Sequence, residues 1–257
     1  MSSVRITLVG GPTALIEFDG FRLLTDPTFD PPGDYPLPHV TLTKLTPPAL
    51  SLEQLGPIDA VLLSHDQHAD NLDHAGKAML AKVGRVLTTK AGAARLGGHV
   101  EGLAPWDTAE LSKPGAKSLR VAATPARHGP AGIEPLSGDV IGFVLTPSDA
   151  GARPIYVTGD TVFYAGVAEV QRRFKPGLVM PFAGSARTRG PFHLTMDTND
   201  VIETAHEFSD AIIVPVHHDG WAHFTQNGDD LAKTFVALGF ASRLRLLEPG
   251  IATTIDY

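Results

Sequence analysis

Short apolar runs bounded by glycine, proline and polar residues recur along the chain, and this pattern predicts strands. They lie at residues 4–9, 13–18, 21–24, 60–63, 119–124, 140–146, 154–158, 178–180 and 211–216. Longer stretches with apolar residues at helical spacing predict helices at 72–82, 162–174, 198–208 and 229–238. This mixture of strands and helices predicts an α/β fold.

A proline-rich segment at residues 27–48 separates the first three predicted strands from the fourth. A loop of that length inside a compact domain is usually functional or mobile. We therefore expect it to border a cleft, with Phe29, Tyr35 and His39 as its substrate contacts.

Histidine or aspartate follows four of the predicted strands, at the point where each strand stops. These residues are His65 with His68, His128, Asp160 and His217. Strand ends on one side of an α/β sheet are where such proteins usually assemble sites. Neutral imidazoles and a carboxylate brought together in this way can hold a divalent metal ion.

The motifs around these residues, taken in order, resemble the metallo-β-lactamase fold superfamily, in particular its lactonase-like and N-acylphosphatidylethanolamine phospholipase D-like hydrolases. The matching stretches are residues 10–18, 24–27, 58–65, 124–128, 158–161 and 215–217. The resemblance implies a four-layer αββα sandwich. It also implies one domain over residues 1–257, with two β-rich halves at roughly 1–125 and 126–257.

The metal loop departs from the family pattern His-x-His-x-Asp-His-Leu-Asp at two places. Two residues, not one, separate His65 from His68, and Asn71 stands where the family has its last histidine. Aligning the loop from its left end instead would put Gln67 in the place of the second histidine and would lose the match at Asp70. We therefore align it from the right.

On this alignment the resemblance implies two adjoining metal positions. The first is held by His65, His68 and His128, with Asp160 able to bridge, which suits a catalytic zinc. The second is held by Asp70, Asp160 and His217, with the amide of Asn71 in place of an imidazole. Because an amide oxygen is a weaker zinc ligand, we expect one tight zinc site and a second that is weak, absent or occupied by manganese.

The implied activity is metal-dependent hydrolysis, in which a metal-bound hydroxide attacks an ester, lactone, amide or phosphodiester. Asp70 or Asp160 positions the water and takes its proton, and His193 or His218 donates a proton to the leaving group. Two alternatives stay open. The departures in the metal loop can have left a degenerate metal- or ligand-binding module, or the fold can carry iron-dependent redox chemistry, as in its flavodiiron and dioxygenase relatives.

Several candidates also have plain structural interpretations. Asp70 can cap the helix predicted at 72–82, although we favour Asp73 for that cap and expect His74 at the surface. Asp160 can cap the next helix, and His128 can be a loop histidine. His193 can be a residue of a helix-entry loop. Asp26 resembles an aspartate at the floor of the family's site, or it is a turn residue before Pro27.

Only one of the neighbours His217 and His218 can point into a site at a strand end, because adjacent side chains of an extended chain face opposite ways. The Pro-x-His context favours His217. For His218, Asp219 and His223 two interpretations stay open: contacts around the site, or surface residues.

Composition narrows the class of partner. The 257 residues are 43% hydrophobic, carry a net charge of −7 and include no dense block of Lys and Arg, so we expect a small-molecule substrate and no nucleic acid. The chain has no cysteine, no signal-like apolar segment at its start and no apolar run of membrane-spanning length, so we expect a cytoplasmic protein without integral membrane association. These features also allow a homo-oligomer.

Overall fold

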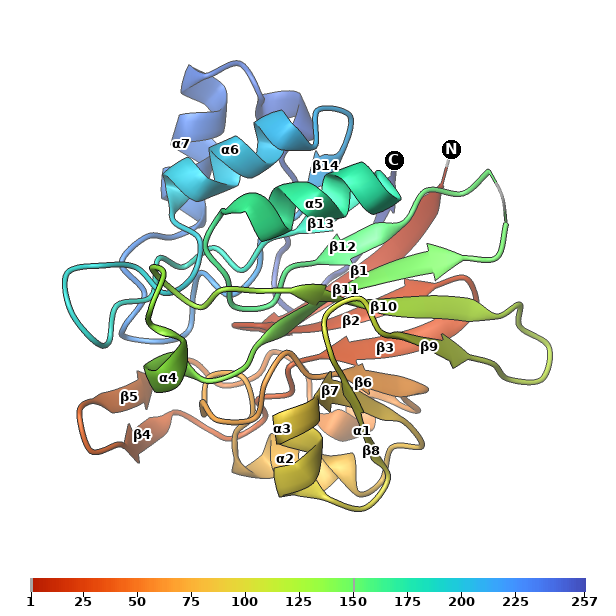
Figure 1. Ribbon diagram of the computed structural model, residues 1–257, viewed down its shortest axis with the longest axis horizontal. Coiled ribbons are helices and arrows are strands. Elements are labelled where there is room, and N and C mark those ends of the chain that lie inside the picture. The colour runs from red at the N-terminus through yellow and green to blue at the C-terminus, as the bar shows by residue number, and fades with distance from the viewer. Residues whose placement is uncertain (1, 150) are drawn as a thin grey trace.

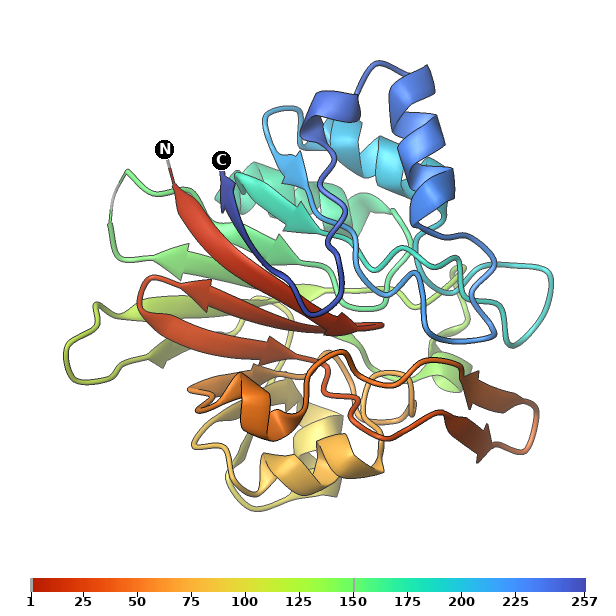
Figure 2. The same ribbon diagram turned by 180° about the vertical axis from the view of Figure 1, so that it is seen from behind.

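Two β-sheets stack face to face in the computed structural model, which describes residues 2–149 and 151–257 (Figures 1 and 2). The first sheet has seven strands, in the spatial order β15 (Ala252–Asp256), β1 (Ser3–Gly10), β2 (Thr13–Phe18), β3 (Phe21–Thr25), β6 (Ala60–Leu62), β7 (Val86–Thr89) and β8 (Val100–Leu103). The pairs from β15 to β3 are antiparallel, and those from β3 to β8 are parallel.

The second sheet has six strands, in the spatial order β14 (Ile212–Ile213), β13 (Leu178–Met180), β12 (Ile155–Val157), β11 (Ile141–Pro147), β10 (Leu119–Pro125) and β9 (Thr108–Leu111). Strands β12 to β14 run parallel, and the other neighbours are antiparallel. A separate hairpin, formed by β4 (Gly33–Pro36) and β5 (Thr41–Lys44), projects from one side of the molecule.

Helices cover the outer faces of both sheets. The lower group in Figure 1 consists of α1 (Leu52–Leu55), α2 (His74–Leu80) and α3 (Lys90–Leu96). The upper group consists of α5 (Ala165–Phe174), α6 (Thr198–Glu207) and α7 (Gly228–Ala237). The remaining short helices are α4 (Glu134–Ser137), near the hairpin, and a 3-10 turn at Ala241–Arg243.

Strand alternation divides the apolar side chains between the inner and outer layers. On β11, Phe143 and Leu145 point into the core between the two sheets, while Val144 packs under the upper helices. On β6, Leu62 points into the same inner core, and Val61 packs against α1 and α2. Period-two alternation on buried strands thus produces four layers, helix, sheet, sheet and helix.

The expected αββα sandwich is confirmed, with differences at element ends. The helix predicted at 162–174 begins only at Ala165, because the backbone N–H of Val162 donates to the carbonyl of Arg127 and so holds that stretch in a loop. The helix predicted at 72–82 is His74–Leu80 and is capped by Asp73, as expected. The strand predicted at 211–216 keeps only Ile212–Ile213 in the ladder.

The segment predicted as a loop at 27–48 contains the β4–β5 hairpin, which the prolines hid. Four strands of the two sheets were also not predicted, namely β7, β8, β9 and β15. In the described part of the chain, no helix is both long enough and apolar enough to cross a membrane.

Candidate metal centre

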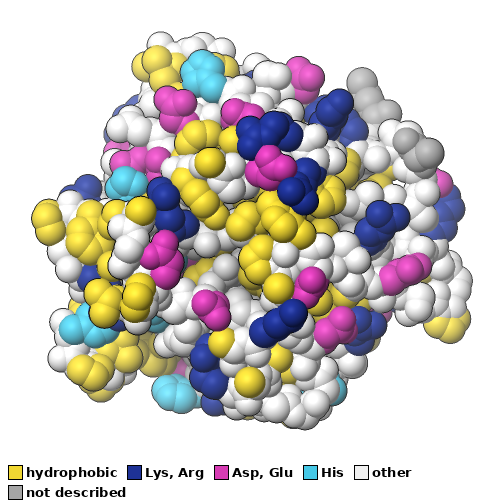
Figure 3. All heavy atoms as spheres, in the orientation of Figure 1, with side chains coloured by type: hydrophobic (Ala, Val, Ile, Leu, Met, Phe, Trp, Pro, Cys, Tyr) yellow, Lys and Arg dark blue, Asp and Glu magenta, His cyan; other side chains and the backbone are white. Residues whose placement is uncertain are grey.

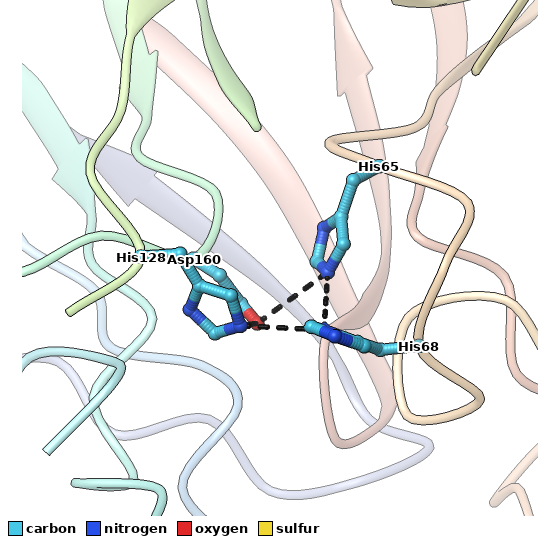
Figure 4. Close-up of side chains that lie close together, drawn as sticks. All are labelled: His65, His68, His128 and Asp160. Atoms are coloured by element: carbon cyan, nitrogen blue, oxygen red, sulfur yellow. Dashed lines mark hydrogen bonds and ion pairs between the residues drawn. The ribbon is translucent and has the colours of Figure 1, made fainter. Parts of the chain in front are cut away.

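Four side chains from three loops meet where β6, β10 and β12 end (Figure 4). His65 and His68 lie on the loop after β6, His128 follows β10, and Asp160 follows β12. One ligand atom from each lies within 4.8 Å of all the others. The structure therefore brings together the first metal set that the sequence predicted.

The ring nitrogens of this first cluster converge on a common point. His68 Nδ1 lies 2.9 Å from His65 Nε2 and 3.3 Å from His128 Nε2. Asp160 Oδ2 lies 3.6 Å from His128 Nε2 and 4.0 Å from His65 Nε2. Tetrahedral ligands about 2.05 Å from a zinc ion are about 3.3 Å apart. The spacing of the four atoms is therefore close to that of a zinc ligand set.

Hydrogen bonds behind the rings fix which nitrogen carries the proton. Ser64 Oγ donates to Asp26 Oδ1 at 2.6 Å, so this hydroxyl must accept from His65 Nδ1, which lies 2.9 Å away. His128 Nδ1 lies 2.9 Å from the carbonyl of Leu194, which can only accept. In the neutral form of each ring the proton therefore lies on Nδ1, and the unprotonated Nε2 faces the cluster, as metal ligation requires.

Burial keeps the rings of His65 and His68 uncharged. It lowers the pKa of His65 well below the ordinary value, and burial together with His128 lowers the pKa of His68 to about 4. Burial also raises the pKa of Asp26 to about 8, against the hydrogen bonds from Ser64. Neutral imidazoles with free lone pairs are the form that binds a metal ion.

A second cluster shares Asp160 with the first and adds Asp70 and His217. His217 Nε2 lies 3.4 Å from Asp160 Oδ1 and 3.5 Å from Asp70 Oδ2, and these contacts are long for hydrogen bonds. His217 has a φ of 57°, and its N–H donates to the carbonyl of Gly11 at 2.8 Å. A non-glycine residue held at positive φ is a strained feature typical of functional sites.

The second cluster contains charged groups, whereas His65 and His68 of the first cluster are neutral. Burial favours the neutral ring of His217, but Asp160 and Asp70 raise its pKa to about 10. Burial works against ionisation of Asp70, yet His223 and His217 hold its pKa well below the ordinary value. His217 and His128 likewise lower the pKa of Asp160. The two carboxylates therefore carry negative charge in a buried place, and the protonated ring of His217 balances only one of them.

Buried polar atoms without partners mark the same place. Asn71 is fully buried, and its Nδ2 lies 3.4 Å from Asp160 Oδ1. Among the described residues, Asn71 Oδ1, Asp160 Oδ2 and both ring nitrogens of His217 have no hydrogen-bond partner. Such atoms are rare in folded proteins, because each one loses its hydration without compensation. Metal ions bound at the two clusters would satisfy Asp160 Oδ2 and the ring nitrogen Nε2 of His217, so these residues fit such ions.

A cavity with an empty volume of about 310 Å³ opens directly over the clusters and is lined by His68, Asp70 and His128. The β4–β5 hairpin contributes Leu37, His39, Val40 and Leu42 to its wall. Hydrophobic side chains gather on the surface on the side where the hairpin and α4 lie (Figure 3). The segment at 27–48 therefore borders the cleft, as expected, and of its three predicted substrate contacts His39 lines the cavity.

The other predicted contacts lie elsewhere. Phe29 packs against the core under α1 and α2. The Tyr35 hydroxyl donates to Asp30, and its ring stacks on His74. His74 is largely exposed, as expected. His218 is buried but is not part of either cluster.

His193 faces helix α6 rather than the clusters. Its Nε2 lies 3.0 Å from Asp200 Oδ2, and its Nδ1 lies 3.6 Å from Asp197 Oδ2. The hydrogen bond with Asp200 raises the pKa of His193 above the ordinary value. Among the described residues, His193 is not one of those that line the cavity over the clusters.

Sequence reasoning missed the residues that hold the ligands in place. Ser64 was only the point where an apolar run stops, yet it links Asp26 to His65. A serine directly before the first histidine was the available signal. The carbonyl of Leu194, which orients His128, left no signal in the sequence, because every residue carries a carbonyl.

Known proteins are similar to this one over nearly the whole chain. UPF0173 protein YddR of Bacillus subtilis (strain 168) is 25% identical, with 98% of this chain and 100% of that protein covered. An isothiocyanate hydrolase from Delia radicum gut bacteria superposes with a TM-score of 0.81 at 23% identity, covering 98% of this chain and 99% of that one.

A protein described as a possible metal-dependent hydrolase from Veillonella parvula superposes with a TM-score of 0.85 at 22% identity, covering 99% of this chain and 100% of that one. The family model of the beta-lactamase superfamily domain matches residues 21–218, which is more than half of the chain. The resemblance found in the sequence motifs is thereby confirmed, and the chain belongs to the beta-lactamase superfamily domain family.

Proposed function

We propose that the protein is a metal-dependent hydrolase that acts on a small molecule. The observation that carries the proposal is the pair of donor clusters that share Asp160, with His68, Asp70 and His128 of these clusters lining one cavity. His65, His68 and His128 would hold zinc at the first cluster, with Asp160 able to bridge, because three imidazoles and an open position are a catalytic zinc set. Asp70, Asp160 and His217 would hold a second ion.

The metal, when bound, supplies Lewis acidity, which polarises an acceptor oxygen and acidifies a water molecule. The protein supplies the rest of the mechanism. Asp70 lines the cavity and carries a buried negative charge, so it can orient the attacking water and take its proton. Apolar side chains at the hairpin tip keep bulk water away from the reacting groups. Because His193 is held by Asp200, we do not assign it the donation of a proton to the leaving group.

The substrate classes that we propose are esters, lactones, amides and phosphodiesters. The apolar cavity wall at Leu37, Val40 and Leu194 favours a substrate with a hydrophobic portion. The structural similarity to an isothiocyanate hydrolase adds isothiocyanates to the compounds worth testing. With no cysteine in the chain, we propose the cytoplasm as its compartment.

The test combines metal content with turnover. Protein purified without chelator is measured by inductively coupled plasma mass spectrometry and assayed on a panel of the four substrate classes and isothiocyanates. We expect bound zinc and hydrolysis of at least one class, and we expect His128→Gln to lose the hydrolysis and the zinc of the first cluster. His206→Gln changes an exposed histidine on α6 and should leave both unchanged.

Other outcomes would redirect the proposal. Zinc binding without turnover on the whole panel would favour the degenerate binding module. Iron with a visible absorption band would favour redox chemistry. A protein that binds no metal at all would overturn the proposal.

A further inference from the structure

A histidine outside the expected ligand sets contacts Asp70 of the second cluster. His223 Nε2 lies 2.9 Å from Asp70 Oδ2, and its side chain is 7% exposed. The other ring nitrogen, Nδ1, is buried and has no hydrogen-bond partner among residues 2–149 and 151–257. His223 also lines the cavity over the clusters, beside Asp70. The ring is therefore part of the site and not surface decoration.

The backbone fixes the position of His223 from both sides. The N–H of Ala222 donates to the carbonyl of Thr43 on β5 at 3.0 Å, and the carbonyl of His223 accepts from the N–H of Arg187 at 3.1 Å. The ring packs edge to face on Phe224, with centroids 4.6 Å apart. Since contacts on several sides hold it, the imidazole is preorganised toward Asp70.

Two imidazoles thus converge on one carboxylate oxygen, because His217 Nε2 lies 3.5 Å from the same Asp70 Oδ2. We propose that His223 is the fourth donor of the second metal position, together with Asp70, Asp160 and His217. It supplies the imidazole that the chain lacks at Asn71. This inference rests on the proposed function, since it concerns the second ion of the same site.

The donor chemistry of the second position changes as a result. Two imidazoles and two carboxylates form a set that zinc binds well, whereas an amide oxygen suits harder ions. The second position is then a zinc site instead of a weak or manganese-like one. Asn71 keeps another task, because its Nδ2 lies 3.4 Å from Asp160 Oδ1 and can orient the shared carboxylate.

The experiment counts zinc per chain after dialysis in zinc buffered by a chelator, for the wild type, His223→Ala, Asn71→Ala and the exposed control His206→Ala. We expect two zinc ions per chain in the wild type, one in His223→Ala, and two in the other variants. The affinity for the second ion should fall more than 100-fold in His223→Ala. The milder His223→Gln, checked for folding by circular dichroism, should show the same loss if the alanine variant is unstable.

The results that would contradict the inference can be told apart from those that would contradict the proposed function. Two zinc ions retained in folded His223→Ala or His223→Gln would overturn the inference and leave the hydrolase proposal intact. One zinc ion in the wild type would do the same. Loss of the second ion in Asn71→Ala with retention in His223→Ala would assign the ligand to the amide instead. No zinc in any variant would overturn the proposed function together with the inference.

Discussion

The ammonium group of Lys44 lies 3.0 Å from Asp73 Oδ2, and both side chains are buried, with 4% and 0% exposure. Lys44 ends β5 of the hairpin, whereas Asp73 caps α2 directly after the metal loop. The pair therefore fastens the hairpin that walls the cavity to the loop that carries His65 and His68. Asp73 Oδ2 also accepts from the N–H of Asp30 at 2.7 Å, so the carboxylate joins three segments.

Removing the cation alone should destabilise the protein strongly. Lys44→Met leaves the charge of Asp73 buried without its partner, and a broken buried pair typically costs about 3–5 kcal/mol. We expect a loss of that size in the free energy of unfolding, measured by urea denaturation. Lys44→Met combined with Asp73→Asn should recover part of it, because no buried charge then remains. The exposed lysine Lys117 is the matched control, and Lys117→Met should leave the unfolding midpoint unchanged.

A loss in Lys44→Met no larger than in Lys117→Met would show that the buried pair does not fasten the hairpin.

The link from Asp26 through Ser64 to His65 should control metal affinity. Ser64→Ala removes the hydroxyl that accepts a hydrogen bond from His65 Nδ1, so the ring loses its fixed tautomer and orientation. Changes of this kind behind a metal ligand typically cost 10-fold to 100-fold in affinity. We expect that loss for zinc in competition with a chromophoric chelator. The buried serine Ser137 lies on α4, and Ser137→Ala should keep wild-type affinity. Equal affinities in the two variants would contradict the role of Ser64.

The contact between His193 and Asp200 should be visible as a pH-dependent contribution to stability. The hydrogen bond with Asp200 raises the pKa of His193 in the folded protein. Because the folded value lies above the unfolded one, the contribution is fully present below the unfolded pKa of about 6.5 and is lost as pH rises through the folded pKa. The wild type should therefore exceed Asp200→Asn in stability most below about pH 6.5, and less at higher pH.

A titration of the His193 ring by nuclear magnetic resonance tests the cause directly. We expect a pKa above the ordinary value in the wild type and a lower one in Asp200→Asn. The N-cap of α6 stays in place in that variant, because Asp197 accepts from the backbone of residue 200. Identical titration curves for the two proteins would rule out the contact as the cause of the raised pKa.

Local sequence patterns predicted the site residues at the strand ends, whereas contacts between distant parts of the chain position the other site residues. His65, His128, Asp160 and His217 each follow an apolar run, so their proximity could be predicted from the sequence. The approach of His223 to Asp70 could not be predicted, because 153 positions along the chain separate the two residues. An isolated β-bridge between Lys44 of β5 and Trp221 positions the turn before His223. A pattern read along the chain contains no signal for such a contact.

The strands that were missed have a similar cause. Val100–Leu103 contains Glu101 and Gly102, and Ala252–Asp256 is mostly polar, so neither reads as an apolar run. Both become strands because a neighbour offers a free edge to pair with, β7 for the first and β1 for the second. Tertiary pairing overrides weak local preference in such cases.

Gly142 offers a last test of how the second sheet supports the site. It lies on β11 between the ends of β10 and β12, which lead to His128 and Asp160. A Cβ there would lie 2.5 Å from the carbonyl oxygen of Thr158 and 2.6 Å from Thr124 Oγ1, so one of the two strand ends must move. Gly142→Ala should lower the free energy of unfolding by about 1–3 kcal/mol, the usual cost of overpacking.

The displaced strand ends should also weaken zinc binding, because β10 and β12 each lead into a ligand of the first cluster. Gly84→Ala is the control, since no atom of the part of the chain that the structure describes lies within 4 Å of a Cβ at that position. It should match the wild type in both urea denaturation and zinc competition. If Gly142→Ala loses stability but keeps full zinc affinity, the loops that follow the strands hold the ligand geometry by themselves, and the site depends less on the sheet than the packing at Gly142 indicates.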